Sequence, residues 1–93
     1  MAIETLAKPS VSPKYMPMYR VLLHNDDFNS MEHVVEVLIR TIPGMQPPQA
    51  ADIMMEAHVN GMAVVIVVPL EHAEFYSEQL KLYGLSSTIE PER

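Results

Sequence analysis

The sequence contains no cysteine and no tryptophan, and basic residues are scarce. Without cysteine there can be no disulfide bond, thiolate metal site or cysteine nucleophile. The 6 lysines and arginines are scattered singly through a chain with 12 acidic residues, and the formal net charge is -6. No basic stripe is therefore available for phosphates, and we expect no nucleic acid partner.

Long apolar runs are also absent. The longest, at residues 62–70, falls well short of the roughly 18 apolar residues that a membrane-spanning helix requires. The first ten residues show neither a basic leader nor the apolar block of a signal peptide. We therefore expect a cytoplasmic protein with no membrane partner.

A hydrophobic fraction of 48% over 93 residues allows one small folded core. Pro9, Pro13 and Pro17 remove backbone donors and disfavour helix in the residues before them. We therefore expect a flexible tail at residues 1–17 and a single core domain at residues 18–93, which we expect to be a monomer.

Hydrophobic periodicity predicts six elements in this core. The predicted strands are residues 19–24, 62–68 and 85–90, and the predicted helices are residues 31–42, 47–60 and 70–83. Ser30 suits an N-cap, and Gly61 and Gly84 suit C-terminal caps. Residues 62–68, rich in β-branched side chains, are predicted to form a buried central strand. The order β-α-α-β-α-β predicts an α+β domain with a three-stranded antiparallel sheet and three helices packed on one face.

The densest polar cluster is His-Asn-Asp-Asp at residues 24–27, between a predicted strand and a predicted helix. Such residues are common in turns, because their side chains hydrogen-bond to their own backbone. Two adjacent carboxylates and an amide beside an apolar helix face also suit a binding site. His58 lies four residues after Met54, so the two are neighbours near the end of the second helix. The alternative for His58 is a capping histidine favoured by the helix dipole.

The remaining histidines, His24, His33 and His72, are predicted to be solvated. No two histidines have the i, i+4 spacing of a helical metal motif, so we expect no metal and no cofactor. The chain has 8 methionines. Methionine is usually core filler, but its flexibility also suits a pocket that accepts side chains of several shapes.

Several of these features occur together between residues 19 and 90. They are Asn25-Asp26-Asp27, Met31-Glu32, Val34, Met54 with His58 and Gly61, and Ala73-Glu74. The combination resembles the ClpS family of adaptor proteins. The resemblance implies a non-enzymatic N-recognin. Such a protein captures substrates with a bulky hydrophobic N-terminal residue (Phe, Tyr, Trp or Leu) and delivers them to a Clp AAA+ unfoldase for degradation.

The same resemblance implies roles for individual residues. The substrate α-amino group would be received by Asn25, Asp26 and His58. The side-chain pocket would be lined by Met31, Val34, Val37, Met54, Ala57 and Leu85, with Asn29 at its floor. Met31 would act as a gate against β-branched residues. Phe28 and Glu71 would contact the N-terminal domain of the unfoldase, and the tail would assist delivery. Asn29 and Ala57 stand where relatives commonly have Thr and Val, so we expect a wider pocket floor.

Two other classes of function compete with the adaptor hypothesis. An enzyme could use Asp26, Asp27 and His58 as metal ligands or as acid and base, but the sequence offers no evident activated water or oxyanion partner. A pocketless protein-interaction domain is the second alternative, since a similar element order occurs in the C-terminal domain of the ribosomal stalk protein and fold alone does not fix function.

Overall fold

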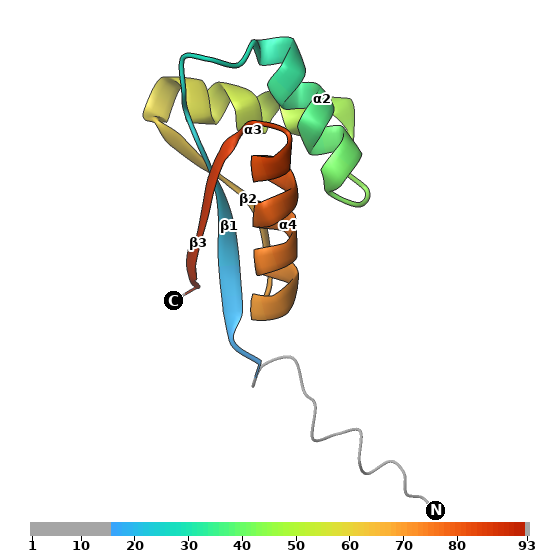
Figure 1. The fold of residues 1–93 in the computed structure, drawn as a ribbon, viewed down its shortest axis with the longest axis vertical. Helices are drawn as coiled ribbons and strands as arrows, with labels where there is room; N and C mark the ends of the chain where they lie inside the picture. The colour runs from blue at the N-terminus through green and yellow to red at the C-terminus, as the bar shows by residue number, and fades with distance from the viewer. Residues whose placement is uncertain (1–15, 93) are drawn as a thin grey trace, which may run out of the picture.

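The structure, a computed structural model, describes residues 16–92. Most of the predicted tail, residues 1–15, therefore lies outside the described residues. The predicted element order is confirmed, and each boundary agrees with its prediction to within one residue (Figure 1). The elements are β1 (Met18–His24), α2 (Met31–Thr41), α3 (Pro47–Asn60), β2 (Met62–Pro69), α4 (Leu70–Leu82) and β3 (Ser86–Pro91).

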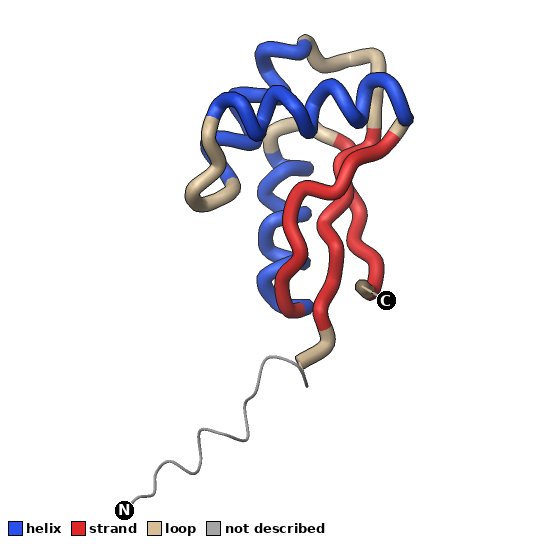
Figure 2. The backbone as a smooth tube through the Cα atoms, turned by 180° about the vertical axis from the view of Figure 1, so that it is seen from behind, coloured by secondary structure: helices blue, strands red, loops and turns tan. Residues whose placement is uncertain are grey.

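The sheet has the strand order β2-β1-β3, and both pairings are antiparallel (Figure 2). The prediction that residues 62–68 form the central strand is wrong, because β2 lies at an edge. Its exposure alternates: Ala63 and Val65 are buried, whereas Val64 is 40% exposed. The centre is taken by β1, where residues 21–23 are all buried. A β-branched apolar run indicates a strand, but it does not tell the centre of a sheet from an edge.

The helices form a layer against this sheet and across its end. Figures 1 and 2 show α4 running along one face of the sheet, with α2 and α3 at the end where β1 finishes. α4 contacts all three strands, α3 contacts β2, and α2 packs on α3 and α4. The core between these layers contains Val21, Leu38 and Leu80, whose side chains are fully buried. None of the helices in residues 16–92 has the length and hydrophobicity needed to cross a membrane.

Local signals in the sequence fix the helix ends. The Ser30 hydroxyl accepts a hydrogen bond from the His33 backbone N–H at 3.1 Å, which confirms the predicted N-cap of α2. Pro47 opens α3, where a missing N–H does no harm. Gly61 ends α3 with φ = 90°, a left-handed conformation that a residue with a side chain rarely adopts.

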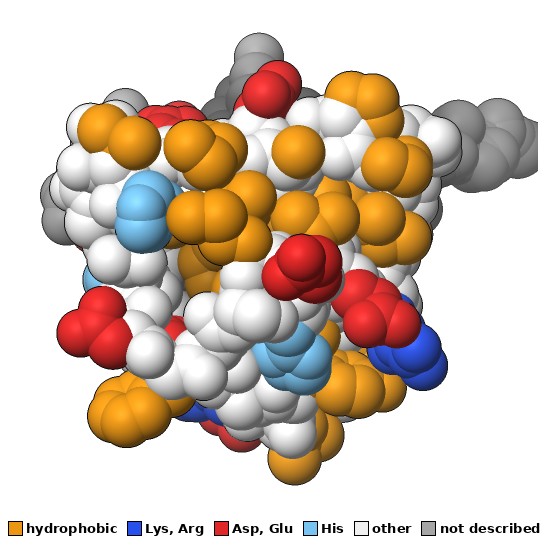
Figure 3. Space-filling model, turned by 90° about the horizontal axis from the view of Figure 1, so that it is seen from above, with side chains coloured by type: hydrophobic (Ala, Val, Ile, Leu, Met, Phe, Trp, Pro, Cys, Tyr) orange, Lys and Arg blue, Asp and Glu red, His pale blue; other side chains and the backbone are white. Residues whose placement is uncertain are grey.

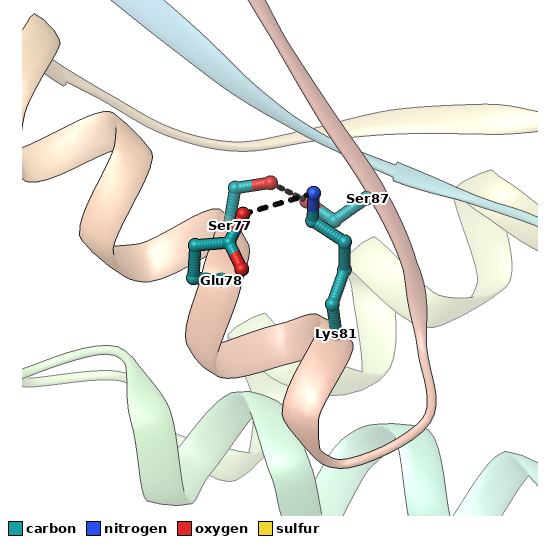
Figure 4. A network of polar contacts seen from close by, with 4 residues as sticks. All are labelled: Ser77, Glu78, Lys81 and Ser87. Atoms are coloured by element: carbon teal, nitrogen blue, oxygen red, sulfur yellow. Dashed lines mark hydrogen bonds and ion pairs between the residues drawn. The ribbon is translucent and has the colours of Figure 1, made fainter.

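A buried polar contact joins α4 to β3. Ser77 and Ser87 are 4% and 5% exposed, and the Ser77 hydroxyl donates to the Ser87 hydroxyl at 2.9 Å (Figure 4). Nearby, the Lys81 ammonium lies 3.1 Å from the Glu78 carboxylate on the exposed side of α4. The serine pair satisfies groups that would otherwise be buried without a partner, so it fixes β3 against the helix.

The packing of α4 predicts a sharp contrast between two leucines. Leu80 is 0% exposed and Leu82 is 76% exposed. We expect Leu80→Ala to lower the free energy of unfolding by about 2–5 kcal/mol, because it leaves a cavity in the core. The matched control, Leu82→Ala, should change it by about 0.5 kcal/mol or less. Urea denaturation measures both, and equal losses in the two variants would contradict this description of the core.

Candidate functional site

A cavity of about 220 Å³ opens where the end of β1 meets α2 and α3. The backbone N–H of Asn25 donates to the carbonyl of Gly61 at 3.0 Å, and this bond holds the loop after β1 against the end of α3. The cavity is smaller than the roughly 300–1,000 Å³ of pockets for drug-sized ligands, so it suits a single side chain. Figure 3 views this end of the molecule and shows hydrophobic side chains gathered with histidine and acidic side chains beside them.

Most of the predicted site residues meet at this cavity. Those in its lining are Asn25, Asp26, Asn29, Met31, Val34, Met54, Ala57 and His58. Val37 and Leu85 are not in the lining; both are packed into the hydrophobic core, at 2% and 4% exposure. Three lining residues have no role in the assignment that the resemblance implies: Leu23, His24 and Asp27. His24 and Asp27 do belong to the polar cluster that the sequence singled out.

The apolar part of the cavity has two walls from different helices. Met31 and Val34 lie on α2, and Met54 and Ala57 lie on α3. Each pair has the i, i+3 spacing that places two side chains on one helix face. Met31 is 44% exposed and so lies at the rim, whereas the small Ala57 is buried. The space between the walls is therefore apolar and open to solvent on one side.

The loop between β1 and α2 is organised by the Asp26 carboxylate. Its Oδ1 accepts hydrogen bonds from the backbone N–H groups of Phe28 at 2.9 Å and Asn29 at 3.0 Å. The side-chain amide of Asn29 lies 3.2 Å from Oδ1 and 3.0 Å from Oδ2, as a donor. Asp26 thus forms the kind of turn in which an aspartate bonds to its own backbone.

These contacts govern the ionisation of Asp26. Partial burial acts to raise the pKa of its carboxyl group. The hydrogen bonds from Phe28 and Asn29, with the positive charge that nearby His33 can carry, outweigh this effect and hold the pKa below its usual value. Asp26 is therefore ionised at neutral pH, with most of its acceptor capacity used inside the loop.

Asp27 is the carboxylate that remains available at the cavity. It is exposed, it lines the cavity, and it has no side-chain hydrogen bond or ion pair with any residue in the 16–92 range. His58, in the last turn of α3, is also exposed and lines the cavity. Together with the side chain of Asn25, these groups place three hydrogen-bond acceptors at the rim of an apolar space.

Two histidines predicted to be solvated are held in place. His24 Nε2 lies 2.6 Å from the Thr88 hydroxyl, which joins β1 to β3. His33 Nε2 lies 2.8 Å from the carbonyl oxygen of Tyr83, and both histidines are half-buried. The prediction that His24 and His33 are solvated is therefore wrong. The sequence did not reveal these contacts, because the partner of each histidine is distant in sequence. His72 is exposed, as predicted.

The two residues predicted to contact an unfoldase lie far apart. Phe28 is 95% exposed in the loop that follows β1. Glu71 is exposed in the first turn of α4, which follows directly after β2. In the sheet register the loop end of β1 faces Met62, whereas its beginning faces Pro69, the residue before α4. Phe28 and Glu71 are therefore at opposite ends of the sheet and do not form one continuous patch.

The residues around the cavity argue against both alternatives, an enzyme and a pocketless interaction domain. Among residues 16–92 no group of three or more histidine or acidic side chains is placed to hold a metal ion. No serine, threonine or lysine lines the cavity, so the usual side-chain nucleophiles other than carboxylate and imidazole are missing from it. A pocketless interaction domain is also at odds with a cavity that has an apolar interior and a polar rim.

Comparisons with known proteins point to one family. Residues 14–88 match the family of the ATP-dependent Clp protease adaptor protein ClpS. The ClpS adapter of Synechococcus elongatus is 61% identical over 94 residues, covering 99% of both chains. The chloroplastic adapter CLPS1 of Arabidopsis thaliana is 53% identical over 81 residues, covering 87% of this chain and 51% of its own length.

A solved structure agrees in fold. The structure of Agrobacterium tumefaciens ClpS2 bound to L-phenylalaninamide has a TM-score of 0.75 with this chain, at 36% identity, and covers 82% of this chain and 98% of its own. The match of sequence over nearly the whole length, and of fold over the described core, leads to one conclusion: this chain belongs to the ClpS family of Clp protease adaptors.

Proposed function

We propose that the cavity binds the first residue of a protein substrate when that residue is Phe, Tyr, Trp or Leu. As a ClpS adaptor, the protein delivers N-end rule substrates to the Clp protease and catalyses no reaction itself. The observation that carries the proposal is an apolar cavity of about 220 Å³ with acceptors at its rim. The ligand of the Agrobacterium tumefaciens relative, L-phenylalaninamide, supports it, because that ligand has a free α-amino group and an aromatic side chain.

The rim residues recognise the α-amino group. An ammonium carries three N–H donors, and Asn25, Asp27 and His58 supply an amide oxygen, a carboxylate and an imidazole nitrogen as acceptors. Leaving one donor unpaired in a desolvated site costs about 1–3 kcal/mol. The resemblance to the ClpS family implied this role for Asp26. We assign this role to Asp27, because the oxygens of Asp26 are engaged within the loop.

The two helical walls recognise the side chain. Burying a Phe-sized group contributes roughly 1.5–3 kcal/mol, and each charge-assisted hydrogen bond contributes a similar amount. After the cost of association, these contributions give an affinity near the micromolar range. Met31, at the rim, closes over the first side chain and disfavours residues that are branched at Cβ. Such a complex selects its substrate and still releases it to the protease.

The partner is a Clp protease, and the contact runs through the N-terminal domain of a AAA+ unfoldase. Phe28 supports this assignment, because an aromatic side chain that is 95% exposed is a strong anchor for a partner surface. Glu71 is a second contact at the other end of β1, so the unfoldase must reach two separate points. The relatives include bacterial and chloroplastic proteins. For this chain we keep the expectation of a cytoplasmic monomer.

Blocking the α-amino group tests the proposal most simply. A peptide beginning with a free N-terminal Phe should bind with micromolar affinity, whereas the same peptide with an acetylated N-terminus should bind about a hundredfold more weakly, because acetylation removes the charge and two of the donors. Fluorescence anisotropy measures both. Equal affinities would mean that the cavity does not recognise a chain start.

The two neighbouring aspartates should separate binding from stability. We expect Asp27→Ala to weaken binding of the Phe peptide about ten- to a hundredfold and to change the free energy of unfolding by less than about 0.5 kcal/mol. Asp26→Ala should lower the free energy of unfolding by about 1–3 kcal/mol, because the turn loses its hydrogen bonds. The assignment is refuted if Asp27→Ala binds like the unmodified protein.

Acidification should weaken binding. A protonated imidazole has no acceptor and repels an ammonium, so affinity for the Phe peptide should be lower in acid than at neutral pH. The matched control is His58→Gln, whose amide oxygen accepts a hydrogen bond and does not titrate. Isothermal titration calorimetry should show a smaller pH dependence for this variant, and identical pH profiles would remove His58 from the α-amino site.

A further inference from the structure

The loop that carries Asn25 and Asp27 is bonded to the turn that follows α4. The side-chain amide of Asn29 donates to the carbonyl oxygen of Gly84 at 2.9 Å and to Asp26 Oδ2 at 3.0 Å. A primary amide has two N–H donors, so one side chain can serve both partners. Asn29 therefore connects the loop of the cavity to the turn between α4 and β3.

A second set of contacts joins α2 to the same turn. His33 Nε2 lies at hydrogen-bond distance, 2.8 Å, from the carbonyl oxygen of Tyr83. The Arg40 guanidinium lies 5.9 Å from the centre of the Tyr83 ring, within the range of a cation–π contact. The last carbonyls of a helix have no partner within it. In this protein the side chains of His33 and Asn29 lie within hydrogen-bond distance of the two carbonyls that follow α4.

The turn itself is shaped to receive these contacts. Gly84 has φ = +92°, a left-handed conformation that favours glycine. A β-carbon at this position would lie 3.7 Å from Asn29 Oδ1, in ordinary van der Waals contact. The turn and the Asn29 side chain are thus directly packed. We call Asn29, His33, Tyr83 and Gly84 the brace.

The loop is consequently held from two directions. At its beginning, the Asn25 backbone is bonded to Gly61 beside α3. At its end, Asn29 is bonded to Gly84 beyond α4. The acceptor Asp27 lies between these two points, and Met31, two residues after Asn29, starts α2. The separation between this wall and the α3 wall therefore depends on both attachments.

We propose that Asn29 and His33 are positioning residues that set the width of the cavity, and thereby its discrimination among N-terminal side chains. The inference rests on the proposed function of the cavity. In a cavity sized for one side chain, a small movement of one wall changes which side chains fit. His33 does so without lining the cavity, through its bond to the turn.

The test uses the full chain and two peptides that differ only in a first residue of Phe or Val. His33→Ala removes one donor of the brace. Asn29→Asp keeps the shape of the side chain but replaces its donors with a second carboxylate beside Asp26. His33→Ala should weaken binding of the Phe peptide about fivefold, the effect expected for one lost hydrogen bond. Asn29→Asp should weaken it more, because it loses the bonds to Gly84 and Asp26 and its carboxylate repels that of Asp26. Each should also reduce the ratio of Phe to Val affinity. The double variant should lose less than the product of the two effects, because both act through one turn.

His33→Gln and His72→Ala are the controls. In His33→Gln the amide can donate to the Tyr83 carbonyl, so this variant should recover the Phe-to-Val ratio. His72 is exposed, so His72→Ala should leave the affinity for both peptides unchanged. A role in folding alone would lower the melting temperature and weaken both peptides by the same factor. An unchanged ratio in His33→Ala and Asn29→Asp overturns the brace while the cavity assignment stands. If the unmodified protein binds neither peptide, the proposed function itself fails, and the brace with it.

Discussion

The hydrogen bonds that Asp26 accepts from its own loop are the constraint on which the site depends. They turn the chain between β1 and α2, so that Asn25 before the turn and Asp27 within it both reach the cavity. Because these bonds engage Asp26, the neighbouring carboxylate is left for a ligand. The folded state lowers the pKa of Asp26, so its ionised form stabilises the fold fully above its ordinary pKa of 3.8. That contribution is lost only as the pH falls through the lower pKa that Asp26 has in the folded state.

The rest of the architecture supports this turn. The sheet and α4 form a rigid base, α3 supplies the facing wall, and the turn after α4 holds the loop from outside. The polar rim takes Asn25 and Asp27 from the loop and His58 from α3, and the apolar walls come from α2 and α3. Under the proposed function, this arrangement requires two properties of a substrate at once: a free chain start and a large apolar side chain. A binding module with these two requirements can select substrates for a protease without any catalytic group.

The fold could be predicted from the sequence because local signals agreed with one another. Helical periodicity, the Ser30 cap and the glycine at position 61 placed the helices to within one residue. The position of β2 in the sheet could not be predicted. An apolar strand suits a centre or an edge, and the choice depends on which strand pairs with both others.

The site was predictable in outline, because the motif residues on the loop, α2 and α3 carried the resemblance to ClpS. The separate roles proposed for Asp26 and Asp27 could not be predicted. Two adjacent carboxylates look alike in a sequence, and only the structure shows which one hydrogen-bonds to the backbone of the turn. Val37 and Leu85 were assigned to the cavity, but in the structure they belong to the hydrophobic core and are not in the lining. The contacts of His24 and His33 were also missed, because their partners are 64 and 50 residues away.

The most direct test of the account is a crystal structure of this protein with L-phenylalaninamide. The account predicts that the aromatic ring lies between the α2 and α3 walls. It also predicts that the ammonium lies within about 3.2 Å of Asp27 and His58, with the hydrogen bonds of Asp26 intact. A ring bound outside the cavity, or an ammonium paired with Asp26 in an opened loop, would contradict it.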